Sequence, residues 1–194
     1  MRQKIAFLKV ALVVVLIGAM GILPGCMKKE PVKIGFVADL TGKQAELGVQ
    51  ERNGVQLAVD KVNAAGGVAG RPVELVIRDD QGKPETAKAV DKQLIDAGVV
   101  AIIGHATSGQ TEAGLSITEP AKMVVVGPTV SSPALTGKYS HFFRVYPSFA
   151  ASAKGFAQHI YKERKVERLA VLYDTDNAAY AQTYKEVFAE QYQS

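Results

Sequence analysis

The sequence predicts an α/β fold in which a parallel sheet carries helices on both faces. Short apolar, β-branched runs alternate with longer stretches of helical apolar spacing through most of residues 32–126. This alternation is typical of a doubly wound sheet, because each parallel connection needs a crossover, usually a helix. Polar residues also cluster directly after three of the predicted strands, which is where open α/β sheets bind ligands.

The first strand and helix are expected within residues 32–65. Residues 32–38 are mostly apolar and predict a strand that ends at Asp39. Residues 40–48 contain a Thr-Gly turn signal and predict a loop. The helix expected over 49–65 has one apolar face, formed by Val55, Ala58, Val59 and Val62.

The second strand and helix follow the same pattern. Residues 73–78 predict a strand, and Asp79 and Asp80 follow it as turn residues. Pro84 suits the first turn of a helix, where its missing N–H costs no hydrogen bond. The helix itself is expected over 85–97.

Residues 99–103 form the most apolar predicted strand. Five apolar residues in a row, four of them β-branched, predict a strand that is buried on both faces. Gly104 ends this strand, and a short polar loop leads to a helix over 110–119. A fourth strand is expected over 123–126.

Beyond residue 146 the pattern begins again. It predicts a helix over 151–163, a strand over 168–173 and a helix over 178–191. The first of these helices has apolar residues at Ala153, Phe156, Ala157 and Ile160. One helix–strand–helix unit cannot bury both faces of its strand. We therefore expect this chain to be a fragment of a longer protein.

The polar clusters after the strands predict a ligand site. They comprise residues 39–41, residues 129–132, and Thr107 with Ser108. Thr107 and Ser108 lie where a parallel strand gives way to a helix, so two hydroxyls and unpaired backbone N–H groups converge there. Such a place suits a small anion such as a carboxylate or phosphate. The alternative is that these hydroxyls are ordinary helix caps.

Residues 1–26 predict a lipoprotein signal peptide. An n-region with three basic residues and no acid precedes an apolar stretch, residues 10–22, that is too short to span a bilayer comfortably. The stretch ends in Leu-Pro-Gly before Cys26, which resembles a bacterial lipobox with Cys26 as the lipidated residue. Residues 27–31 form a tether. The alternative is an uncleaved signal anchor with an incidental cysteine.

The charge of the remaining chain excludes one class of partner. The 23 basic and 19 acidic residues give a net charge of +4, but Arg2, Lys4 and Lys9 lie in the signal peptide. The rest is near neutral and lacks basic runs, so we expect no nucleic-acid partner. Because Cys26 is the only cysteine, no intramolecular disulfide is possible.

The ordered set of motifs resembles the type I periplasmic binding proteins, in particular the branched-chain amino-acid binding proteins of ABC importers. The matching segments are residues 34–42, 53–70, 79–80, 102–105, 127–136 and 142–144. The resemblance implies two α/β lobes that close on a ligand. Residues 32–146 would form an incomplete N-terminal lobe, and residues 147–194 would begin a second lobe that is truncated here.

The resemblance also implies the ligand contacts. Ser108 matches the serine that holds the ligand carboxylate, and Val130 with Ser131 matches the segment that holds carboxylate and ammonium. Tyr180 matches the aromatic residue that closes over the ligand, and Thr107 borders the same site. The chain departs from well-known members at Leu47, where they have tyrosine, and at Gly82 and Thr107, which replace their two disulfide-forming cysteines. The acidic residue that pairs with the ligand ammonium lies outside this chain.

These features predict a solute receptor and not an enzyme. We expect a lipoprotein of the periplasm or cell surface that delivers a small amino acid, with branched-chain ones favoured, to an ABC permease. No metal or cofactor is expected. One alternative is a sensor domain of the same fold that signals to a membrane partner. Another is an exported hydrolase using Ser108, but no Gly-x-Ser-x-Gly elbow surrounds it and no acid is placed to orient His105.

Overall fold

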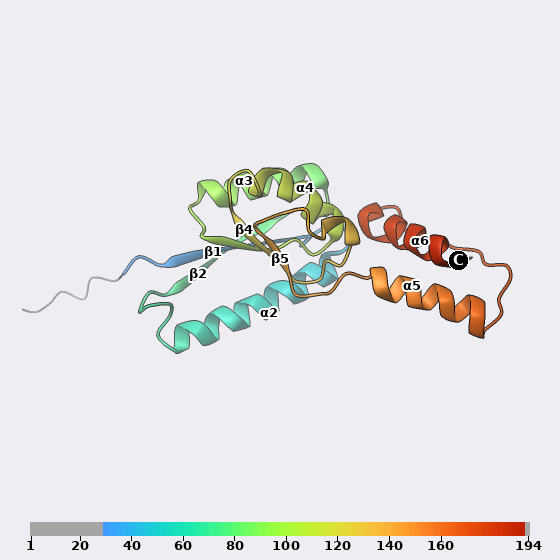
Figure 1. Ribbon diagram of the computed structural model, residues 1–194. Coiled ribbons are helices and arrows are strands. Elements are labelled where there is room, and N and C mark those ends of the chain that lie inside the picture. The colour runs from blue at the N-terminus through green and yellow to red at the C-terminus, as the bar shows by residue number, and fades with distance from the viewer. Residues whose placement is uncertain (1–28, 193–194) are drawn as a thin grey trace, which may run out of the picture.

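The computed structural model describes residues 29–192 and contains one five-stranded sheet. The predicted signal peptide and Cys26 lie outside these residues. All neighbouring strands are parallel, in the order β2-β1-β3-β4-β5. Helices α3 and α4 lie on one face and α2 on the other (Figure 1). The predicted α/β fold with a doubly wound parallel sheet is confirmed.

Most predicted elements form close to their expected bounds. The strands are β1 (Val32–Ala38), β2 (Val73–Asp79), β3 (Ala101–Gly104), β4 (Val124–Gly127) and β5 (Phe142–Arg144). The helices are α2 (Ala45–Ala64), α3 (Pro84–Asp96), α4 (Ser108–Thr118), α5 (Ala150–Gln158) and α6 (Ala178–Tyr192). A 3-10 turn, η1 (Pro133–Leu135), follows β4, and a π-helical turn, η2 (His159–Glu163), extends α5. Within residues 29–192 no helix is both long and apolar enough to cross a bilayer.

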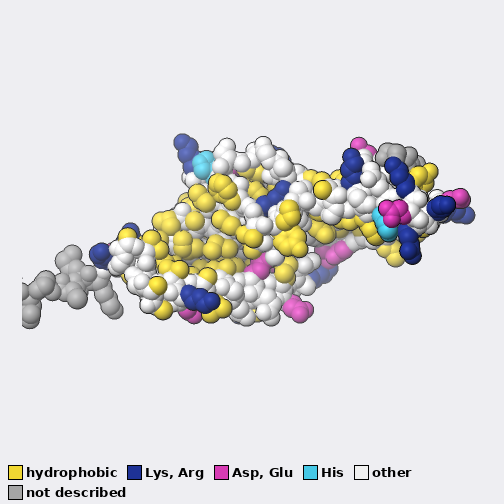
Figure 2. All heavy atoms as spheres, turned by 60° about the horizontal axis from the view of Figure 1, so that its bottom comes forward, with side chains coloured by type: hydrophobic (Ala, Val, Ile, Leu, Met, Phe, Trp, Pro, Cys, Tyr) yellow, Lys and Arg dark blue, Asp and Glu magenta, His cyan; other side chains and the backbone are white. Residues whose placement is uncertain are grey.

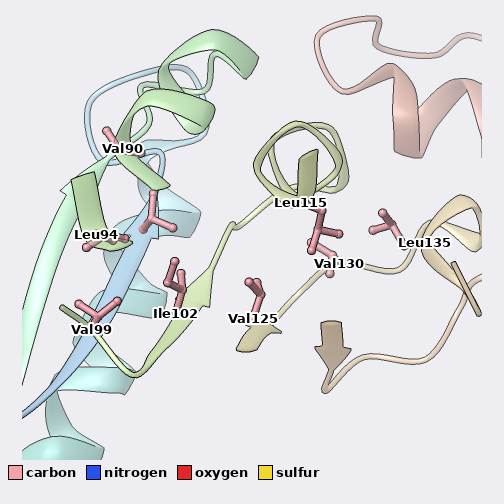
Figure 3. Close-up of a cluster of buried hydrophobic side chains, with 9 residues drawn as sticks. Val90, Leu94, Val99, Ile102, Leu115, Val125, Val130 and Leu135 are labelled. Atoms are coloured by element: carbon pink, nitrogen blue, oxygen red, sulfur yellow. The ribbon is translucent and has the colours of Figure 1, made fainter. Parts of the chain in front are cut away.

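The main hydrophobic core lies between the sheet and helices α3 and α4 (Figure 3). Strand side chains such as Ile102 and Val125 meet Leu94 of α3 and Leu115 of α4, and each is at most 2% exposed. Alternate strand residues point to opposite faces. The strands are therefore fixed in register, and their carboxyl ends meet at one edge of the sheet.

The other face of the sheet is only partly covered. Helix α2 packs on β1 and β2, while the half formed by β3, β4 and β5 has no helix over it among residues 29–192. Figure 2 shows apolar side chains gathered on this side of the molecule. Phe143 is 58% exposed and Val145 is 74% exposed. An apolar surface of this kind favours association with another surface.

Helix α2 differs from the sequence prediction in two ways. It begins at Ala45, four residues before the expected start, because the Asp39 carboxylate accepts the backbone N–H groups of Gly42 and Gln44 and so supports the chain at the helix start. Its predicted apolar face is also less buried than expected. Val59 is buried, but Ala58 and Val62 are exposed because α2 reaches only the β1–β2 half of the sheet.

The strand predicted over 168–173 is wrong. These residues lie beside the α5–α6 pair with no strand assigned, and Leu172 is 97% exposed. A strand needs a neighbouring strand to pair its backbone groups, and none lies beside this segment among the described residues. The predicted helices on either side do form, and they pack on each other through Ala157, Phe188 and Tyr192. An apolar hollow of about 460 Å³ lies between the helices and the unpaired segment.

A buried polar cluster centred on His105 fixes the connection from β3 to α4. The ring Nδ1 lies 2.6 Å from Asp80 Oδ2, and Nε2 lies 3.2 Å from Asp91 Oδ2. Burial lowers the pKa of His105, but the hydrogen bonds to Asp80 and Asp91 outweigh it and raise the pKa to about 9. The expectation that no acid orients His105 is therefore wrong. The two aspartates come from the end of β2 and from α3, which only the fold brings together.

Helix α4 passes this cluster at Gly114. A Cβ atom at that position would lie 2.2 Å from Asp91 Oδ2 and 2.6 Å from His105 Nε2. Glycine is therefore the residue that allows α4 to approach the charged cluster. The cluster ties β2, α3 and α4 to the loop that carries Thr107 and Ser108.

The exposed half of the sheet predicts self-association of this 194-residue chain and poor solubility. Replacing Phe143 and Val145 together by serine should lower the self-associated fraction, because both are exposed apolar side chains at β5. Size-exclusion chromatography with light scattering measures the effect. Leu172→Ser, at an exposed apolar site away from the sheet, serves as the control. Equal association of the double variant and the parent chain would contradict this account.

The His105 cluster predicts a pH-dependent stability. Because the folded-state pKa is about 9 and the ordinary value is 6.5, the stabilisation is full below pH 6.5 and is lost as the pH rises through 9. His105→Gln should destabilise the whole mature protein by about 3–5 kcal/mol, since two buried carboxylates lose their cation. It should also flatten the pH dependence of urea unfolding between pH 6.5 and 10. An unchanged slope in the variant would refute the role of His105.

Candidate functional site

Two of the three polar clusters predicted after the strands, Thr107 with Ser108 and residues 129–132, meet at one cavity of about 560 Å³, whereas residues 39–41 do not line it. It lies at the carboxyl edge of the sheet, over the ends of β1, β3 and β4, and includes the point between β1 and β3 where the strand order reverses. Doubly wound sheets bind ligands at such switch points. The lining residues are Gln44, Leu47, Ala106, Thr107, Ser108, Thr129, Ser131, Tyr146, Asp174, Asn177, Tyr180 and Ala181.

Ser108 begins α4 and Thr107 is its N-cap residue. The Thr107 side chain makes no capping hydrogen bond, although its extended backbone places it at the usual N-cap position. The first amides of a helix have no intrahelical acceptor, and here the Gly109 N–H reaches Asn177 Oδ1 at 3.3 Å. The helix start therefore brings Thr107 and Ser108 to the cavity, as the sequence predicted, while the Gly109 N–H is already paired with Asn177.

The loop after β4 places Ser131 in the wall of the same cavity. The two loops touch where the Ser132 N–H donates to Ser108 Oγ at 3.4 Å. Arg144 holds this loop by donating to the Ser132 carbonyl at 2.8 Å. Val130, predicted as a ligand contact, does not line this cavity: it is 1% exposed and its side chain packs in the main core.

Aromatic and apolar side chains form the remaining wall. Tyr180, in the first turn of α6, is 40% exposed and packs edge-to-face on Phe149 with the ring centroids 5.1 Å apart. Leu47 and Tyr146 line the cavity as well. The position of Tyr146 at this cavity was not predicted. It depends on the path of the chain after β5, for which the sequence gives no local signal. The lining of the site thus combines hydroxyls, amides and the Asp174 carboxylate with aromatic and apolar side chains.

Glu51 is a further polar residue close to the cavity. Thr129 Oγ1 lies 2.6 Å from Glu51 Oε1 and 2.6 Å from the Ala106 carbonyl. A hydroxyl has one hydrogen to donate. Burial raises the pKa of the Glu51 carboxyl, and Thr129 opposes the shift. In the protonated form Glu51 donates to Thr129, which in turn donates to Ala106 and fixes the loop beside Thr107.

Three aspartates near the cavity accept hydrogen bonds from the surrounding loops. Asp39, Asp79 and Asp80 have carboxylate oxygens within 4.8 Å of one another. Their oxygens accept hydrogen bonds from neighbouring groups: Asp39 from two loop amides, Asp79 from Leu40 and Gln81, and Asp80 from Gly82. These carboxylates order the loops at the sheet edge.

The geometry also argues against Ser108 as a hydrolytic nucleophile. A general base must accept the serine proton through a free nitrogen. Both ring nitrogens of His105 face carboxylates, and the ring is 1% exposed. His105 is thus a structural cation and is not available to activate Ser108.

Comparison with known proteins places these observations in a family. Residues 31–194 match the model of the family described as periplasmic binding protein. The chain is similar to the leucine-, isoleucine-, valine-, threonine- and alanine-binding protein of Pseudomonas aeruginosa, with 30% identity over 149 residues. It is 30% identical over 146 residues to the Leu/Ile/Val-binding protein of Escherichia coli K12. These alignments cover 76% and 75% of this chain but only 40% of each relative.

Solved structures agree with the sequence matches. A branched-chain amino-acid transporter substrate-binding protein from Streptococcus pneumoniae, in complex with isoleucine, aligns with a TM-score of 0.76 and 30% identity. That alignment covers 85% of this chain and 47% of the other. An ABC transporter substrate-binding protein from Desulfitobacterium hafniense, in complex with leucine, aligns with a TM-score of 0.66 and 31% identity over 84% and 48% of the chains. The chain therefore belongs to the type I periplasmic binding proteins of the branched-chain amino-acid family.

Proposed function

We propose that this chain is part of an extracytoplasmic solute-binding lipoprotein that delivers a small amino acid to an ABC importer. The observation that carries the proposal is the convergence of Ser108, at the start of α4, and Ser131, after β4, on one cavity. Hydroxyls and helix N-terminal amides suit a ligand carboxylate. The relatives named for leucine, isoleucine and valine make these the first ligands to test.

The rest of the receptor is proposed on the same basis. Residues 32–146 form the N-terminal lobe, and residues 147–194 begin the second, from which Tyr180 closes over the ligand. The amino acid lies with its carboxylate between Ser108 and Ser131, in the cavity that Leu47 and Tyr146 also line. Delivery requires contact with the permease while Cys26 holds the protein at the membrane, in the periplasm or at the cell surface.

Ser108→Ala tests the ligand site. A hydrogen bond to a charged group contributes about 1.5–3 kcal/mol, so the variant should bind its amino acid about 10- to 100-fold more weakly. Isothermal titration calorimetry on the whole mature protein, with leucine, isoleucine and valine, measures this. Ser116→Ala is the matched control, because Ser116 lies exposed on the same helix. No heat from the wild type with any amino acid would contradict the proposed function.

Cys26→Ser tests the lipid anchor. The variant should move from the membrane fraction to the soluble fraction and should lose incorporation of labelled fatty acid, because Cys26 is the only thiol in the chain. Two acyl attachments hold a protein firmly at a bilayer, whereas removal of both leaves no anchor. If the wild type incorporates no fatty acid, the lipoprotein assignment fails while the ligand site is unaffected.

A further inference from the structure

A second, smaller cavity adjoins the proposed ligand cavity. It measures about 280 Å³ and shares Gln44, Thr107 and Asn177 with the first. Its other walls come from the loop after β1, the turn after β2, the first turn of α4 and the residue before Asn177 in the turn that leads to α6. These residues are Asp39, Gly42, Lys43, Gln81, Gly82, Lys83, Gln110 and Asp176.

Two buried side chains in its wall have hydrogen-bonding atoms without partners among the described residues. They are Thr107 Oγ1 and Gln110 Oε1, on residues that are 6% and 4% exposed. The Gln110 amide nitrogen donates to the Gly82 carbonyl at 2.6 Å, which sets the side chain so that its oxygen is the free atom. Unpartnered buried polar atoms are uncommon in native proteins, and a bound molecule is one explanation.

The charged groups of this wall have partners. The Asp39 carboxylate accepts the N–H groups of Gly42 and Gln44 at 2.5 and 2.9 Å. The Lys43 ammonium lies 2.5 Å from Asp176 Oδ2. The Lys83 ammonium donates to Gln81 Oε1 at 3.4 Å. The unused capacity of the buried side chains in this wall is therefore neutral: an amide oxygen that accepts, and a hydroxyl that both accepts and donates. A neutral hydroxyl or carboxamide matches it, whereas a hydrocarbon leaves both atoms unpaired.

We propose that this second cavity is a side-chain subsite for an amino acid that ends in a neutral hydroxyl or carboxamide. This subsite rests on the proposed function. The ligand carboxylate must lie at Ser108 for the ligand's side chain to extend past Thr107 into the second cavity. Thr107 and Ser108 are adjacent in sequence, and both line the first cavity. Selection then follows from Thr107 Oγ1 and Gln110 Oε1, which only a polar side chain satisfies.

The test compares pairs of ligands of similar shape, threonine with valine and asparagine with leucine. Calorimetry on the whole mature protein should show the polar member of at least one pair binding about tenfold or more tightly, because a site built to hydrogen-bond a group rejects the analogue that lacks it. Thr107→Val removes the hydroxyl with little change in shape. It should weaken binding of the polar member about tenfold more than it weakens binding of the apolar member.

The controls separate this proposal from the proposed function. Ser116→Ala should keep the wild-type preference, and thermal melts should show that each variant is folded. Tighter or equal binding of valine and leucine by the wild type would overturn the polar subsite and leave the amino-acid receptor intact. A polar preference that persists in Thr107→Val would also overturn it. Failure of all four amino acids to bind would refute the receptor assignment and the subsite with it.

Discussion

The site depends on one buried cation held between two carboxylates. His105 lies three residues before Ser108, and its ring joins Asp80 at the end of β2 to Asp91 of α3. A buried charge is tolerated only when it is paired and hydrogen-bonded. The β3–α4 connection therefore has one well-satisfied arrangement, in which Thr107 and Ser108 start a helix at the carboxyl edge of the sheet. Because Gly114 has no side chain, α4 can lie against the same cluster.

Sequence patterns were sufficient for the first four strands of the sheet and for the edge at which the cavity lies, but not for β5. The buried strand around Ile102 has a strong apolar signal, and polar residues after parallel strands necessarily share one edge. Ser108, Ser131 and Tyr180 accordingly line one cavity. The patterns failed where partners come from elsewhere in the chain. No local signal links His105 to Asp80 and Asp91. An apolar run such as residues 168–173 predicts a strand whether or not another strand is available to pair with it.

Glycines gave a further misleading signal. Gly48 lies within the stretch predicted as a loop, yet it belongs to α2, where a Cβ atom would lie 2.0 Å from the Asp39 carbonyl oxygen. The helix needs glycine there to pass the end of β1. The sequence does not distinguish a glycine that permits close packing within a helix from one that permits a turn. The start of α2 could therefore not be predicted from composition alone.

The start of α4 shows how local stability and ligand recognition compete at this edge. A threonine at the N-cap position ordinarily caps its helix, which is worth about 1 kcal/mol, but the Thr107 hydroxyl makes no such bond and faces no protein partner among residues 29–192. Gln110 in the same turn also leaves its oxygen unpaired. Departures of this kind from local consistency are expected at functional sites, where the missing bonds are made to a ligand. The fold provides the compensation nearby, because the His105 cluster and the Glu51–Thr129 contact hold the flanking loops without using Thr107 Oγ1 or Gln110 Oε1.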